Sequence, residues 1–165
     1  MRKSTEIIVR NGVVAALYFV LTLLTFPVSF LGIQFRIAEV LVLLCFFRKD
    51  YVIGITFGCV IANLFSTIGV IDAVFGLVTN LAVGLLVGRR RYLAIACLFP
   101  VVINAFLVGA ELYWILKEPF WYSVGTVAIG ELGVMVLGYF IFFFCRRNDA
   151  FMRSIKGNQN LDYKF

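Results

Sequence analysis

Residues 120–144 read FWYSVGTVAIGELGVMVLGYFIFFF, an apolar run in which Glu131 is the single charged residue. A helix needs about 20 mainly apolar residues to cross the hydrocarbon core of a bilayer, so this run predicts a membrane-spanning helix. Five further apolar runs precede it, of which the second and third are short. Together they predict six membrane-spanning helices, over residues 12–31, 37–47, 51–65, 70–87, 92–116 and 120–144.

The composition of the whole chain agrees with this interpretation. Of its 165 residues 62% are hydrophobic and 15% are charged, whereas a soluble domain is about half apolar and about a quarter charged. A water-soluble globule is therefore excluded. Six spans leave no room for an attached soluble domain, so we expect one all-α integral membrane domain over residues 1–145. Residues 146–165 are polar and are expected to form a cytoplasmic tail.

Basic residues are distributed unevenly between the two predicted sides of the membrane. If the N-terminus is cytoplasmic, all but two of the 15 Lys and Arg residues lie inside, the exceptions being Arg36 and Lys117. Cytoplasmic loops of membrane proteins carry such an excess of positive charge, so both termini are predicted to be cytoplasmic. The net charge of +6 reflects these topology signals, and no nucleic acid partner is expected.

Several motifs that would indicate catalysis are missing from the sequence. Histidine is absent, no CxxC pair is present, and no GxxxxGKS/T phosphate loop is found, so we expect no metal, no cofactor, no ATPase site and no enzymatic activity. The four cysteines fall inside or at the ends of apolar runs, where they are expected to fill the core. They are Cys45, Cys59, Cys97 and Cys145.

Charged residues inside membrane helices are costly and usually face a cavity or a partner. Arg36 and Glu39 begin the second predicted helix at its outer end, and Asp72 begins the fourth. At 1.5 Å per residue, Glu111 lies about 8 Å below the outer end of the fifth helix, and Glu131 lies near the middle of the sixth. Because the inner halves of the helices carry almost no charge, these side chains predict a polar site that opens outward.

Amide side chains accompany these charges on the same helix faces, since Asp72 and Asn80 are eight residues apart and Asn104 and Glu111 are seven apart. Four carboxylates against one arginine favour a cationic ligand, or a neutral ligand rich in N–H donors. The predicted substrate-binding residues are Gln34, Arg36, Glu39, Asn63, Asp72, Asn80, Asn104 and Glu111.

The same residues are also compatible with purely structural roles. Arg36 is also suited to an ion pair with Glu39 or Asp72, Glu111 to a neutral helix contact, and the asparagines to hydrogen bonds between helices. Two other functional classes compete with a ligand-binding transport subunit. One is a self-contained ion-coupled carrier, which Glu131 near the midplane would suit, and the other is a noncatalytic scaffold.

Three segments resemble the QueT family, namely QFRIAE at 34–39, GCVIANL at 58–64 and GVIDAVFG at 69–76. Members of this family are substrate-binding S components of energy-coupling factor (ECF) transporters, associated with uptake of queuosine precursors. The resemblance implies a six-helix S component in the bacterial plasma membrane, working with one membrane T component and two ABC ATPases. It also implies that substrate binds on the outer side, and that Gly12 and Ala16 contact the T component.

The substrate implied by the resemblance is a 7-deazaguanine: the nitrile base, the aminomethyl base or queuine. Such a base offers N–H donors along one edge, a carbonyl and a flat face, and its aminomethyl form adds a cation. A carboxylate suits the donor edge and an amide suits the carbonyl. Glu39 and Glu111 are the preferred carboxylates, with Asn63, Asn80 and Asn104 as amide partners. Another vitamin or nucleobase-like nutrient is the alternative substrate, and the role of Glu131 stays open.

Overall fold

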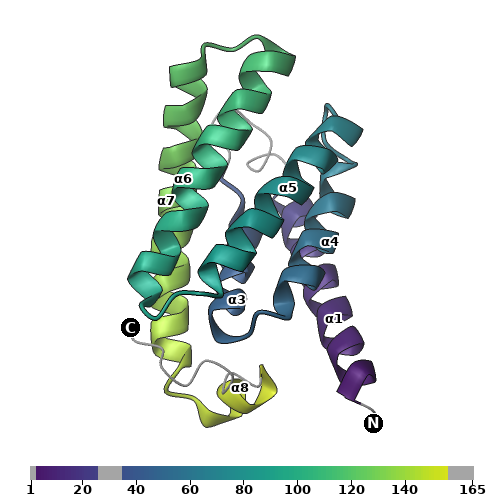
Figure 1. Ribbon diagram of the computed structural model, residues 1–165, viewed down its shortest axis with the longest axis vertical. Coiled ribbons are helices and arrows are strands. Elements are labelled where there is room, and N and C mark those ends of the chain that lie inside the picture. Colours follow the sequence, from purple (N-terminus) through teal and green to yellow (C-terminus); the bar gives the residue numbers. More distant parts are fainter. Residues whose placement is uncertain (1–2, 26–34, 156–165) are drawn as a thin grey trace.

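The computed structural model describes residues 3–25 and 35–155, and every regular element within them is a helix (Figure 1). The all-helical prediction is thereby confirmed. The elements are α1 (Lys3–Leu24), the 3-10 helix η1 (Ile37–Leu43), α3 (Leu44–Phe47), α4 (Tyr51–Asn63), α5 (Val70–Val87), α6 (Leu93–Glu111), the π-helical turn η2 (Leu112–Leu116), α7 (Phe120–Cys145) and α8 (Asp149–Ser154).

Four of these helices are long and apolar enough to cross a membrane. They span Ser4–Leu24, Val70–Val87, Leu93–Leu116 and Phe120–Cys145. The second and third predicted spans correspond to shorter apolar segments, Ile37–Phe47 and Tyr51–Asn63. The described residues therefore contain four candidate membrane spans of full length and two shorter apolar segments.

The chain reverses direction at each step from α1 through η1–α3, α4, α5 and α6 to α7 (Figure 1). α1 packs against α4 on one side of the bundle, α6 packs against α7 on the other, and α5 joins the two pairs through contacts with α4 and α6. Helix α8 lies at the same end of the bundle as the beginning of α1 (Figure 1).

The segment Ile37–Phe47 forms the centre of the bundle, where η1 contacts α1, α4, α5, α6 and α7. Residues from Val42 to Phe47 are all buried, as expected for a helical stretch that is apolar on every face. With a rise of about 2.0 Å per residue in a 3-10 helix and 1.5 Å in an α-helix, the segment is about 20 Å long. It is shorter than the hydrocarbon core of about 30 Å, and longer helices enclose it.

Glycines on α4 allow α1 to approach closely. A Cβ atom on Gly58 would lie 2.6 Å from the carbonyl oxygen of Ala15, and one on Gly54 would lie 2.5 Å from the carbonyl oxygen of Asn11. The Gly54 backbone N–H donates to Asn11 Oδ1 at 2.7 Å, which adds a polar contact between the first turn of α4 and α1. Small residues at helix contacts are typical of membrane bundles.

The first helix begins before residue 12, which is the start predicted from the sequence. Helix α1 extends back to Lys3, and Glu6 and Arg10 form an i,i+4 ion pair at 3.6 Å on it. Asn11 ties this polar part of α1 to α4. Helix α1 ends at Leu24, whereas residues 26–31 of the predicted span lie outside the described residues.

The beginning of the predicted polar tail forms a short helix that packs onto the bundle. Asn148 caps α8, because its Oδ1 accepts from the backbone N–H groups of Ala150 and Phe151. Phe151 packs against the core, and Tyr51 donates its hydroxyl proton to the carbonyl oxygen of Ile155 at 3.1 Å. This end of the chain is thus attached to the start of α4.

We expect Gly58→Ala to lower the melting temperature in detergent, because the added Cβ must push the α1 backbone away. Overpacking of this kind costs about 1–3 kcal/mol. Gly125→Ala is the matched control: nothing lies within 4 Å of a Cβ at Gly125, and Ala favours a helix over Gly by about 1 kcal/mol. Equal melting temperatures for Gly58→Ala and the wild type would contradict the close α1–α4 contact.

Candidate functional site

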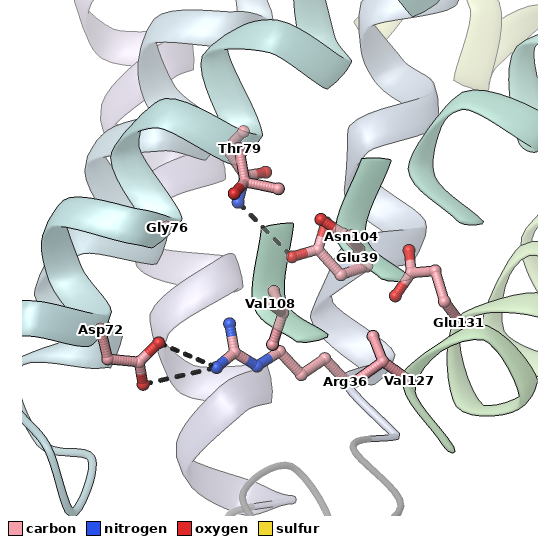
Figure 2. A pocket seen from close by; sticks show the side chains of 10 residues that line it. Arg36, Glu39, Asp72, Gly76, Thr79, Asn104, Val108, Val127 and Glu131 are labelled. Carbon is pink, nitrogen blue, oxygen red and sulfur yellow. Dashed lines mark hydrogen bonds and ion pairs between the residues drawn. The ribbon is translucent and has the colours of Figure 1, made fainter. Parts of the chain in front are cut away.

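A polar cavity lies between η1, α5, α6 and α7, inside the helical bundle (Figure 2). Its free volume is about 10 Å³, which is room for about one water molecule. The lining residues are Arg36, Glu39, Asp72, Gly76, Thr79, Asn80, Asn104, Val108, Val127 and Glu131. The structure therefore brings together five residues that were predicted from the sequence, namely Arg36, Glu39, Asp72, Asn80 and Asn104.

The polar lining residues lie at two depths. Asp72 is in the first turn of α5, near the end of the bundle where α5 and α7 begin. Asn80 is ten residues into α5 and Glu131 is eleven residues into α7. At 1.5 Å per residue these two lie about 15–16 Å from that end. Asn104 lies at a similar depth, twelve residues before Leu116 ends η2. We call Asn80, Asn104 and Glu131 the floor residues.

Arg36 and Asp72 form a buried ion pair nearer the end of the cavity, with 3.3 Å between Arg36 Nη2 and Asp72 Oδ1 (Figure 2). Asn63 on α4 supports the pair from behind, because its Nδ2 donates to the backbone carbonyl of Asp72 at 3.0 Å and to Asp72 Oδ1 at 3.1 Å. Asn63 itself does not belong to the lining. Asp72 is thus held by two elements besides its own helix.

Glu39 is 2% exposed and extends from η1 into the cavity. The hydroxyl of Tyr18 on α1 donates to Glu39 Oε1 at 2.5 Å, and Asn80 Nδ2 donates to the same oxygen at 3.5 Å. Tyr18 was not predicted as a site residue. The signal that indicates it is weak: it follows Asn11 at i+7, on the same face of α1, and a buried Tyr hydroxyl usually finds a polar partner.

Three buried oxygen atoms of the lining have no hydrogen-bond partner within the part of the chain that the structure describes. They are Thr79 Oγ1 and Asn80 Oδ1 on α5, and Glu131 Oε1 on α7. Buried polar atoms are normally paired, and each unpaired one costs about 1–3 kcal/mol. Their convergence on one cavity indicates a site for a polar ligand.

The remaining predicted residues lie apart from this cavity or outside the described residues. Glu111 is buried at the last residue of α6 but is not in the lining. Gln34 lies outside the described residues. Gly12 and Ala16 are exposed on α1, one turn apart.

The cavity and the fold together define a class of protein. Its lining offers carboxylates, amides and a hydroxyl, and it is enclosed by helices long and apolar enough to span a membrane. Polar side chains at such depth mark the binding sites and pathways of membrane transport proteins. The fold and the cavity thus indicate a multi-pass membrane protein of the transport class, with a polar cavity inside its bundle.

The comparisons with known proteins agree with this class. The sequence profile of the QueT transporter family matches residues 8–147. Over 159 residues the chain is 35% identical to the queuosine precursor transporter QueT of Lactococcus lactis subsp. cremoris (strain MG1363), covering 86% of this chain and 93% of that protein. No solved structure gives a significant match. The chain belongs to the QueT transporter family, as its three sequence segments indicate, and is a multi-pass protein of a bacterial membrane.

We expect Asp72→Asn to destabilise the ligand-free protein more than the double variant Arg36→Gln/Asp72→Asn does. Removing one partner of a buried ion pair leaves an uncompensated charge and costs about 3–5 kcal/mol, whereas removing both avoids this penalty. Melting temperatures in detergent measure the difference. A double variant that melts at or below the temperature of Asp72→Asn would show that the pair is not the main partner of either side chain.

Proposed function

We propose that this protein is the S component of an ECF importer that binds a queuosine precursor of the 7-deazaguanine type and delivers it to the cytoplasm. The observation that carries this proposal is the set of unpaired oxygens facing the cavity, at Thr79, Asn80 and Glu131. A deazaguanine presents N–H donors on both its pyrimidinone ring and its pyrrole ring, so it can pair with oxygens on opposite walls. Membership of the QueT transporter family supports the same substrate class.

The proposed topology has six passages with both chain ends in the cytoplasm. The alternation of chain direction supports it, as does the position of α8 at the same end of the bundle as the start of α1 (Figure 1). The α3–α4 connection contains Arg48 and Lys49, and the α5–α6 connection contains residues 89–91, all of them Arg. These basic connections lie at the same end as α8 (Figure 1), so that end is assigned to the cytoplasm. The Arg36–Asp72 pair then lies toward the outside.

Substrate binding requires the lining side chains to move apart. A bicyclic base is several times larger than the single water that about 10 Å³ accommodates. In the proposed bound state Glu39 and Asn80 contact the ligand from η1 and α5. Arg36 faces its carbonyl or its ring, and Asp72 orients Arg36. Glu111, with a buried Oε1 that has no hydrogen-bond partner among the described residues, remains a predicted site residue.

The proposed partners are a T component and two ABC ATPases. The exposed positions Gly12 and Ala16 support a contact through α1, because they leave its outer face flat next to Val13 and Leu17, which are also exposed. A Cβ on Gly12 would meet nothing within 4 Å. Tyr18, on the inner face of the same helix, hydrogen-bonds to Glu39. Helix α1 therefore connects the proposed partner surface to the cavity.

We expect the purified wild-type protein to bind 7-aminomethyl-7-deazaguanine in a calorimetric titration, and Glu39→Gln to weaken that binding about 10- to 100-fold. Hydrogen bonds to a charged group contribute about 1.5–3 kcal/mol, and about 1.4 kcal/mol is a factor of ten in affinity. Guanine and an unrelated vitamin are the control ligands. If the folded protein binds no deazaguanine, the proposed substrate is wrong.

We expect Ala16→Trp to prevent copurification with the T component while leaving deazaguanine affinity unchanged, because the bulky ring covers the flat face of α1. The matched control is Ile129→Trp, at a residue of α7 that is 69% exposed and lies on a different helix. Unchanged copurification of Ala16→Trp would contradict the proposed surface. Uptake by the chain alone in liposomes would instead indicate a self-contained carrier.

A further inference from the structure

Glu131 is a carboxylate at the floor of the cavity, and the sequence alone leaves its role open. It is 3% exposed on α7, at the depth of Asn80 and Asn104. Its side chain points from α7 toward Asn104 and Glu39, and Thr79 lies on the α5 side of the same space (Figure 2). A carboxylate held at this depth needs a partner of its own.

The three lining carboxylates differ in how their oxygens are used. Asp72 Oδ1 accepts from Arg36 and from Asn63, and Glu39 Oε1 accepts from Tyr18 and from Asn80. Glu131 Oε1 is also buried, yet it accepts no hydrogen bond from any described residue. Glu131 shares a hydrogen bond with the side chain of Asn104, but its Oε1 keeps acceptor capacity for a ligand. By contrast, Asp72 Oδ1 and Glu39 Oε1 each receive two hydrogen bonds from the protein.

The neighbours of Glu131 indicate which ligand group suits it. Asn104, which lies beside it on α6 (Figure 2), carries an amide that can donate to a carbonyl. A carboxylate next to an amide donor matches a ligand edge that presents two parallel N–H donors followed by a carbonyl oxygen. The pyrimidinone ring of a deazaguanine has this edge: its 2-amino group, its ring N1–H and its 6-carbonyl. Two parallel N–H donors bind a carboxylate in the side-by-side manner of a guanidinium.

We propose that Glu131 is a substrate-binding residue that accepts hydrogen bonds from the N1–H and the 2-amino group of the base, with Asn104 donating to the adjacent 6-carbonyl. This assignment rests on the proposed function and specifies how the substrate is oriented. The pyrimidinone ring lies at the floor against α6 and α7. The pyrrole ring then faces the α5 wall, where Thr79 Oγ1 and Asn80 Oδ1 are unpaired.

The test compares two ligands that differ only by the 2-amino group, 7-aminomethyl-7-deazaguanine and 7-aminomethyl-7-deazahypoxanthine. By calorimetry, we expect the wild type to prefer the 2-amino ligand at least about tenfold, because a charge-assisted hydrogen bond is worth about 1.5–3 kcal/mol. Glu131→Gln has one carboxylate oxygen fewer and no charge. It should bind the 2-amino ligand about 10- to 100-fold more weakly and lose most of the preference between the two ligands.

Two further variants separate direct contact from a structural role. Glu118→Gln is the matched control, because Glu118 accepts a hydrogen bond from Ser123 at 3.2 Å and lies outside the lining, so both affinity and preference should be retained. Glu131→Asp keeps both oxygens and should keep part of the preference, even if Glu131→Gln fails to fold. Melting temperatures verify folding of each variant.

The possible results differ in what they overturn. An equal preference for the 2-amino ligand in the wild type and in folded Glu131→Gln would overturn the assignment of Glu131 while leaving the proposed function intact. Glu131→Asp could also lose the whole preference while both Glu131 variants bind the deazahypoxanthine as tightly as the wild type does. That result would still support contact between residue 131 and the 2-amino edge of the base. A folded wild type that binds neither ligand would overturn the proposed function itself, and this assignment with it.

Discussion

The short central segment Ile37–Phe47 imposes the constraint on which the rest of the structure depends. It is about 20 Å long, which is shorter than the hydrocarbon core. Because backbone N–H and C=O groups without partners are costly in lipid, the segment must be covered on all sides by other helices. Five helices surround η1. Since η1 carries Glu39 into the bundle, its neighbours must also supply polar partners, and Tyr18 and Asn80 do so. The helices that pack around η1 therefore also form the polar cavity.

The polar side chains of the cavity differ in how fully they are hydrogen-bonded. Toward the end where α5 begins, Asp72 is held by Arg36 and Asn63. Deeper, Asn80 and Glu131 keep unpaired oxygens. Each such atom destabilises the ligand-free protein by about 1–3 kcal/mol, and a ligand that pairs with them recovers this free energy on binding. Asp72, whose Oδ1 receives two hydrogen bonds, suits a role in orienting Arg36, and the unpaired oxygens of the floor suit contact with the substrate.

Much of the fold could be predicted from apolar runs, because a membrane helix must be apolar over its whole length. Helix α5 occupies the predicted residues 70–87, and α7 extends only one residue beyond its predicted run. The start of α1 could not be predicted this way, since residues 3–11 are largely polar and their helix is held by a contact between Asn11 and α4. The 3-10 geometry of η1 has no signature in the apolar pattern.

The sequence by itself determined the class of protein, its long apolar helices, its family and five of the residues that line the cavity. These follow from composition and local spacing, which the bilayer restricts directly. Only the tertiary structure decided that Glu131 lines the cavity while Glu111 does not, and that Tyr18 on α1 reaches Glu39. Helical periodicity states which residues share a face. The rotation and depth of each helix, which decide what that face meets, are set by packing between helices far apart in the sequence.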